Sequence, residues 1–186
     1  MRISGLVVMG VSGCGKSSVA AAVAQQIGGR LIEGDAFHPE ANLRKMTLGQ
    51  PLTDDDRAGW LDRLSGLMTA EIGQGGLPVL ACSALKARYR TVLRRAGPGI
   101  GFLFLDLDRD AAAMRVATRP DHFMPASLID SQFAALERPS DEPAVLTVDA
   151  TAPIDAIVRH TENWLQALAE TPQEGAEAMS AARALV

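Results

Sequence analysis

The chain has only two cysteines and no long apolar run, and these features argue against a disulfide-rich, zinc-binding or membrane protein. Its two cysteines, Cys14 and Cys82, have no CxxC or Cys/His spacing, so we expect neither a disulfide framework nor a structural zinc site. No apolar stretch approaches the roughly 18 residues needed to cross a bilayer, and Met1 and Arg2 lead into a strand-like segment without the apolar core of a signal peptide. We therefore expect a cytoplasmic protein with no membrane partner.

Positive charge is also scarce. The 18 lysines and arginines are outnumbered by 22 aspartates and glutamates, which gives a formal net charge of -4. Such a chain has no general positive field for a nucleic-acid backbone, so we expect no nucleic-acid partner, and an anionic ligand must be held by a local group of charges. With 186 residues, 47% hydrophobic and 22% charged, the chain has the composition of one folded globular domain.

Short apolar segments alternate with segments of helical period along the whole chain. The segments are apolar throughout rather than alternately polar, which is typical of strands covered on both faces. This pattern predicts an α/β fold, a three-layer sandwich with a five-stranded parallel sheet and helices on both faces. The expected strands contain residues 6–9, 31–32, 79–82, 102–105 and 145–148.

The segments between these strands carry helix signals. Apolar residues recur at helical spacing over residues 19–27 and 60–68, and they are interpreted as core rather than as a cofactor site. Thr53 and Asp56 have the spacing of a capping box, and Pro39 suits a first helical position.

Two segments stand apart from the regular alternation. A polar break at residues 119–126 separates helical segments expected at 111–117 and 126–136. Residues 170–186 are rich in alanine and glutamate and have no strong apolar face, so we expect a tail there and a single domain over residues 1–169.

Residues 10–17, GVSGCGKS, match the phosphate-loop motif G-x-x-x-x-G-K-[ST], and they follow a predicted strand and open a predicted helix. The glycines let the backbone N–H groups turn toward phosphate oxygens, and the helix N-terminus adds partial positive charge. Lys16 is expected to reach the β- and γ-phosphates, and Ser17 to bind Mg²⁺. The motif therefore predicts ATP and Mg²⁺ as cofactors. Cys14 is interpreted as a small filler of the loop rather than a nucleophile.

The phosphate loop alone does not decide the reaction, because GTPases and transport ATPases also carry it. The chain has no N-K-x-D segment, which argues against a GTPase. We find no apolar strand that ends in the aspartate of an ordinary Walker B motif, and the third strand is expected to end in Cys82 and Ser83.

Four blocks of sequence resemble the gluconokinase family, within the shikimate-kinase-like group of P-loop kinases. They are MGVSGCGKS at 9–17, EGD with HP and Asn42 at 33–42, PL with DDDR and Trp60 at 51–60, and CSALK with YR at 82–90. The resemblance spans about residues 5 to 165 and implies ATP-dependent phosphorylation of D-gluconate to 6-phosphogluconate. It also suggests a homodimer and a lid near residues 119–126. Two alternatives stay open: a kinase for shikimate, glycerate or a nucleoside monophosphate, and a nucleotide-gated binding module.

Asp35 follows the second predicted strand, at the sheet edge where α/β folds place their ligands. Its carboxylate could accept the proton of the acceptor hydroxyl or could hold a magnesium-bound water, and both roles are kept. The residues expected to act in catalysis are Lys16, Asp35 and Arg119, and those expected to hold the metal are Ser17 and Asp35.

Further residues are candidates for the two ligands. The nucleotide set is Gly10, Ser12, Gly13, Cys14, Gly15, Lys16, Ser17 and Ser18 of the loop, with Arg115 and Arg119 as arginines before and at the lid. The substrate set is Asp35, His38, Arg57, Ser83, Lys86, Arg90 and His122.

Four members of the substrate set have explicit alternatives. His38 could bind a substrate hydroxyl or, as the residue before Pro39, could be only a helix cap. Arg57 could hold the carboxylate of a sugar acid or could form a local ion pair within its acidic run. Lys86 and Arg90 are four residues apart, which predicts one basic helical face, although such residues are often merely solvated.

Overall fold

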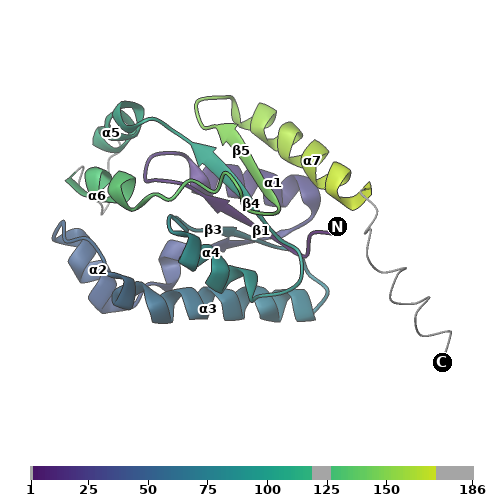
Figure 1. Ribbon diagram of the computed structural model, residues 1–186, viewed down its shortest axis with the longest axis horizontal. Helices are drawn as coiled ribbons and strands as arrows, with labels where there is room; N and C mark the ends of the chain where they lie inside the picture. The colour runs from purple at the N-terminus through teal and green to yellow at the C-terminus, as the bar shows by residue number, and fades with distance from the viewer. Residues whose placement is uncertain (1, 119–126, 171–186) are drawn as a thin grey trace.

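The structure is a computed structural model that describes residues 2–118 and 127–170. It has one five-stranded sheet between two layers of helices (Figure 1). In chain order the elements are β1 (Gly5–Met9), α1 (Lys16–Ile27), β2 (Arg30–Glu33), the 3-10 helix η1 (Gly34–Phe37), α2 (Glu40–Thr47), α3 (Asp54–Gly73), β3 (Pro78–Ala81), α4 (Ala87–Arg94), β4 (Ile100–Asp106), α5 (Arg109–Ala117), α6 (Ser127–Ala135), β5 (Val145–Asp149) and α7 (Ile154–Glu170).

All five strands are parallel and lie in the order β2-β3-β1-β4-β5, which confirms the predicted sheet. Because β1 lies at the centre, the loop that follows it is flanked by the loops that follow β3 and β4. The segments after β2 and β3 therefore reach the same edge of the sheet as the phosphate loop, where α/β folds bind their ligands.

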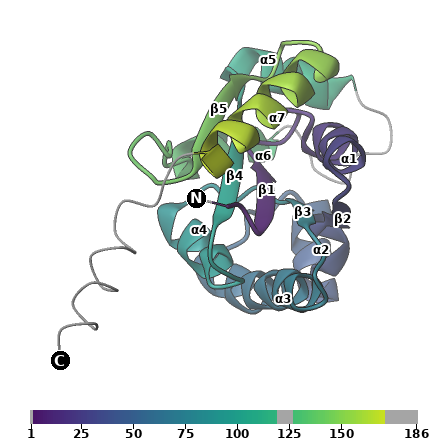
Figure 2. The same ribbon diagram turned by 90° about the vertical axis from the view of Figure 1, so that its right-hand side faces the viewer.

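The two faces of β1 show why its sequence is apolar throughout. Leu6 and Val8 face the layer that contains α1, α5, α6 and α7, whereas Val7 and Met9 face α3 and α4 (Figure 2). All four side chains are fully buried. Trp60 of α3 fills the second layer, and its indole N–H donates to the carbonyl of Gly34 at 2.9 Å, so the large ring is buried without an unpaired donor.

The predicted capping box is confirmed at the start of α3, where Thr53 and Asp56 exchange side-chain and backbone hydrogen bonds. Pro39 precedes α2 as its N-cap residue, one position before the predicted one. Helix α6 matches the segment expected at 126–136. The lid at 119–126 and nearly all of the tail lie outside the described residues, and α7 continues to Glu170. None of the described helices is long and apolar enough to cross a membrane.

Candidate active site

The loop between β1 and α1 has a backbone that favours glycine, as its first and last glycines show. Gly10 has φ +143, and a Cβ there would lie 2.8 Å from the carbonyl oxygen of Leu105 and from Cys14 Sγ. Gly15 has φ +92 and precedes the first residue of α1, with no atom within 4 Å of its would-be Cβ. Left-handed backbone and open space before a helix N-terminus are what a phosphate group needs to approach the main chain.

Lys16 and Cys14 occupy this loop in different ways. Lys16 Nζ donates to the carbonyl oxygen of Val11 at 3.0 Å, so its ammonium lies over the loop. The Cys14 side chain is buried, and burial raises the pKa of its thiol. A buried protonated thiol is a poor nucleophile, which supports the interpretation of Cys14 as a filler.

Ser17 has a carboxylate partner, Glu33, that is not among the predicted site residues. Its hydroxyl donates to Glu33 Oε2 at 3.0 Å, and Glu33 is the last residue of β2. A hydroxyl and a carboxylate are oxygen ligands of the kind Mg²⁺ prefers. Glu33 stood in the EGD block at the carboxyl end of an expected strand, and that position at the ligand-binding edge of the sheet was the signal that could have identified it.

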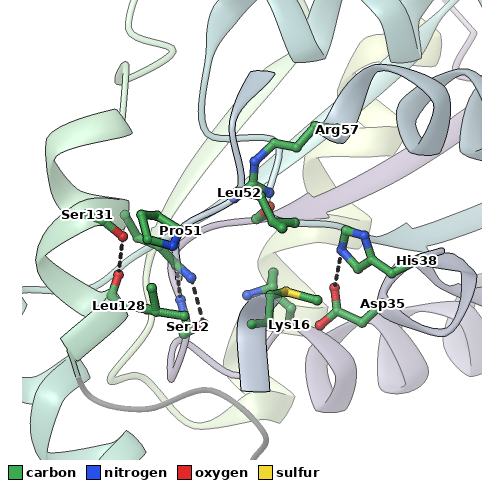
Figure 3. A pocket seen from close by; sticks show the side chains of 12 residues that line it. Ser12, Lys16, Asp35, His38, Pro51, Leu52, Arg57, Leu128 and Ser131 are labelled. Atoms are coloured by element: carbon green, nitrogen blue, oxygen red, sulfur yellow. Dashed lines mark hydrogen bonds and ion pairs between the residues drawn. The ribbon is translucent and has the colours of Figure 1, made fainter. Parts of the chain in front are cut away.

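A pocket opens between this loop, the segments that follow β2 and β3, and helix α6 (Figure 3). It brings together Lys16, Asp35, His38, Arg57 and Ser83, which are predicted site residues from four separate segments of the sequence. Apart from Ser12, the rest of the lining was not predicted. It consists of apolar and uncharged polar side chains from α2, the loop before α3, and α6. Among the residues that the structure describes, those that line it are Ser12, Lys16, Asp35, His38, Met46, Pro51, Leu52, Arg57, Ser83, Leu128, Ser131 and Gln132.

Arg57 lines the pocket, and its contacts show whether it forms a local ion pair, which was the alternative to binding a sugar acid. Two of the three aspartates that precede it are engaged elsewhere: Asp54 pairs with Lys86 and Arg88, and Asp56 pairs with Lys45 at 2.6 Å. Within the described residues Arg57 has no ion pair, and its guanidinium lies 5.9 Å from the Tyr89 ring. The structure therefore does not show the local ion pair that was the alternative, and it leaves a guanidinium at the pocket for an anion.

The prediction that Arg90 binds substrate is not supported, because Arg90 is only 1% exposed and its guanidinium is fully engaged. It donates to the carbonyls of Ala84 and Leu85 at 2.9 and 3.0 Å and pairs with Glu142. Ala84 has φ +45, an unusual backbone for a residue with a side chain. Arg90 thus supports the backbone of the loop that carries Ser83, and we withdraw it from the substrate set.

Lys86 is also placed outside the pocket. It is the N-cap residue of α4 rather than a residue on its face, so the predicted basic helical face does not form. Its ammonium donates to both carboxylate oxygens of Asp54, at 2.9 and 3.1 Å. Four-residue spacing indicates a common face only inside a helix, and the helix begins one residue too late.

His38 lies in the wall of the pocket with a defined ring orientation. Its ring stacks on Trp60 with centroids 4.0 Å apart, and Asn42 Nδ2 lies 3.4 Å from Nδ1. An amide nitrogen only donates, so Nδ1 accepts and a neutral ring carries its proton on Nε2. That nitrogen faces Asp35 Oδ1 at 4.0 Å. His38 thus offers a donor at the pocket, and it is also the C-cap residue of η1, whereas Pro39 is the N-cap residue of α2.

The protonation of His38 should make folding stability depend on pH. Burial, aided by the charge of Arg57 and opposed by Asp35, lowers the pKa of His38 from 6.5 to about 4. Between these values the unfolded chain binds more protons than the native one, so stability falls as pH falls through this window. Relative to His38→Gln, the wild type should lose about 2 kcal/mol of unfolding free energy between pH 7 and pH 5, measured by urea denaturation. Parallel losses in both proteins would contradict the assignment.

The arginine proposed to flank the nucleotide lies beside the phosphate loop. Arg115 Nη1 donates to the carbonyls of Ala150 at 3.1 Å and Gly13 at 3.4 Å, and so joins the loop after β5 to the phosphate loop. Arg119 and His122 lie outside the described residues.

Apolar strand β4 ends in an aspartate, so it tests the expectation that no apolar strand ends in the aspartate of an ordinary Walker B motif. Strand β4, IGFLFLD, ends in Asp106. However, both Asp106 oxygens accept hydrogen bonds from Arg138, at 2.7 and 2.8 Å, and Asp106 is not among the residues that line the pocket with Lys16. Glu33, rather than Asp106, is the carboxylate found at Ser17.

A phosphate loop on a parallel sheet, with a pocket that joins its lysine to a carboxylate and a guanidinium, defines a P-loop kinase of small molecules. The chain is 44% identical to gluconokinase of Gluconobacter oxydans over 162 residues, 87% of this chain and 91% of the relative. It is 40% identical to thermoresistant gluconokinase of Escherichia coli over 83% of this chain and 89% of the relative. The chain belongs to the gluconokinase family.

Solved structures agree with this placement. A gluconokinase from Sinorhizobium meliloti superposes with a TM-score of 0.81 at 45% identity, covering 91% of this chain and 96% of the other. A sugar kinase from Janibacter gives a TM-score of 0.84 at 40% identity, over 89% and 95% of the two chains. The APS kinase CysC of Mycobacterium tuberculosis, at 24% identity and TM-score 0.63, shares the fold over 89% and 98% of the chains. No family model matches the chain.

Proposed function

We propose that the protein transfers the γ-phosphoryl group of ATP to D-gluconate, giving 6-phosphogluconate and ADP. The observation that carries this proposal is the pocket in which Lys16 of the phosphate loop faces Asp35 and Arg57. It places a phosphate-binding cation, a proton acceptor and a carboxylate-binding cation around one space. The gluconokinase relatives support the choice of acceptor.

The nucleotide is held by the loop between β1 and α1. Its N–H groups and the N-terminus of α1 bind the phosphates, and Lys16, whose ammonium has three donors, reaches the β- and γ-phosphate oxygens while it donates to the Val11 carbonyl. Ser17 and Glu33 would hold Mg²⁺, which offsets the negative charge of the phosphates when bound. Arg115 borders the same loop and adds positive charge beside it.

The acceptor lies across the pocket from the phosphates. Arg57 binds the gluconate carboxylate, because a guanidinium that no described carboxylate engages can make a bidentate contact with it. His38 Nε2 and Ser83 provide polar groups for sugar hydroxyls. The carboxylate end is thereby held away from the loop, and the terminal hydroxyl is presented to the γ-phosphate.

Asp35 is the proton acceptor in this mechanism. Its position after β2 left two roles open, and of these the metal-shell role is better filled by Glu33, whose carboxylate contacts the Ser17 hydroxyl. Asp35 instead lines the acceptor side of the pocket with its side chain half exposed, 49%, and faces His38. Removal of the hydroxyl proton by Asp35 as the phosphoryl group arrives leaves the new phosphate ester and ADP.

The proposal is tested by ADP release measured with gluconate, shikimate, glycerate, AMP and no acceptor. Release that depends on gluconate is the expected result. Release that depends on another acceptor would replace gluconate, and release without any acceptor, or none at all, would favour a nucleotide-gated module. The cytoplasmic location and the homodimer stay predictions.

Replacement of Arg57 should affect the two substrates unequally. In Arg57→Gln the gluconate KM should rise roughly ten- to hundredfold, because a charge-assisted contact worth about 1.5 to 3 kcal/mol is lost. The ATP KM should stay within about threefold. Arg63→Gln is the matched control on the same helix, since Arg63 is exposed and lies against Phe37. Equal increases in both KM values would assign Arg57 to the phosphates or to folding.

A further inference from the structure

Gln132 of α6 makes two hydrogen bonds to one residue of the phosphate loop. Its Oε1 accepts from the backbone N–H of Ser12 at 2.7 Å, and its Nε2 donates to Ser12 Oγ at 3.0 Å. The two residues are 120 positions apart in sequence and both are buried, 8% and 7% exposed. Because the Gln132 amide contacts Ser12 at two points, it fixes the orientation of Ser12 as well as its distance from α6.

The bond to Ser12 N–H acts on a peptide group that also contacts Lys16. The N–H of the Val11–Ser12 peptide points to Gln132, and its carbonyl, on Val11, accepts from Lys16 Nζ at 3.0 Å. One peptide plane is therefore held at both ends, by α6 at its N–H and by Lys16 at its carbonyl. If the N–H lost its partner, this plane could rotate and displace the carbonyl from the lysine.

Helix α6 is itself fixed to the rest of the molecule. Ile129 is buried in the core on the face of the sheet covered by α1, α5 and α7, and Arg109 of α5 pairs with Asp130 at 2.6 Å. Just after the helix, the N–H of Glu137 donates to the carbonyl of Leu85 at 2.9 Å. These contacts hold the Gln132 side chain in place without help from the nucleotide.

Ser12 and Gln132 lie where the phosphate loop meets the acceptor pocket. Both line the pocket together with Lys16 and Asp35, and in Figure 3 Ser12 lies beside Leu128 and Ser131 of α6. We propose that Gln132 is a positioning residue for phosphoryl transfer: it fixes the Val11–Ser12 peptide and thereby aligns the phosphate loop and Lys16 with the acceptor. This inference rests on the proposed function.

The test compares the ADP-release kinetics of wild type, Gln132→Met, Ser12→Ala and the double variant. Methionine keeps the length and volume of glutamine and removes both hydrogen-bonding groups. We expect kcat of Gln132→Met to fall about tenfold or more while the gluconate KM stays within about threefold, because alignment rather than acceptor binding is lost. Ser12→Ala keeps the backbone N–H bond and should lose about threefold. The double variant should match Gln132→Met within about twofold, because the hydroxyl contact is already absent there.

Gln25→Met on the exposed face of α1 is the matched control and should behave as wild type. Wild-type kcat in Gln132→Met, or losses that multiply in the double variant, would overturn the inference while leaving the proposed function intact. If Gln132→Met does not fold, Ser12→Ala decides, and an unchanged kcat in it overturns the proposal. If the wild type releases ADP without an acceptor, the proposed function fails, and the same ratios measured on that release still test Gln132.

Discussion

Lys16→Met is expected to abolish phosphoryl transfer in a protein that remains folded. The lysine lies over the phosphate loop and donates to the Val11 carbonyl, so it stabilises charge on bound phosphates rather than packing in the core. Loss of such a positioned cation should lower kcat by about 10²- to 10³-fold or more. ADP release at saturating ATP and gluconate measures the loss, and circular dichroism confirms the fold.

Lys86→Met is the matched control for this experiment. Lys86 contacts Asp54 outside the pocket, and Asp54 keeps its contacts with Arg88 and Tyr89 in the variant. Both KM values and kcat should therefore stay within about threefold of wild type. A soluble Lys16→Met with near-wild-type turnover would remove Lys16 from the mechanism, and a large rise in gluconate KM for Lys86→Met would restore Lys86 to the substrate set.

Asp35→Asn should bind both substrates and turn them over slowly. Asparagine keeps the size and polarity of the side chain but cannot accept a proton, so kcat should fall by about 10²- to 10⁴-fold, the usual contribution of a positioned general base. The gluconate and ATP KM values should change little, because Arg57 and the phosphate loop are intact. Steady-state kinetics at several magnesium concentrations provide the measurement.

Glu33→Gln distinguishes the proton-acceptor role proposed for Asp35 from the magnesium-binding role proposed for Glu33. Removing the carboxylate beside Ser17 should move half-saturation to higher magnesium, whereas Asp35→Asn should keep the wild-type requirement. A shifted magnesium requirement in Asp35→Asn would exchange the two roles. A loss of less than about tenfold in Asp35→Asn, below the usual contribution of a general base, would withdraw Asp35 from catalysis.

The parts of the site that could be predicted from the sequence depend on local pattern or on strand ends. The phosphate loop is a contiguous motif, and Asp35 and Ser83 directly follow strands, so the parallel sheet alone brings them to one edge. The capping box of α3 is likewise local, because its two members are three residues apart.

The remaining features depend on partners that are distant in sequence. Arg90 and Arg57 look alike as basic residues near expected helices, yet Glu142 and two carbonyls engage Arg90 whereas Arg57 keeps a place in the pocket. Glu33 and Gln132 gain their roles from Ser17 and Ser12, which lie on other elements. Spacing along the chain identifies a charged residue as a candidate. Whether another residue pairs with that charge, and so removes it from the site, depends on the tertiary packing.

The most direct measurement of the central claim is the product itself. Purified protein is incubated with ATP, Mg²⁺ and gluconate, ADP is quantified, and the phosphorylated product is identified by mass spectrometry and ³¹P NMR. We predict one 6-phosphogluconate for each ADP, with the phosphate on the terminal carbon. ADP formed without a phosphorylated gluconate, or phosphate on another hydroxyl, would contradict the orientation that Arg57 and Asp35 give to the acceptor.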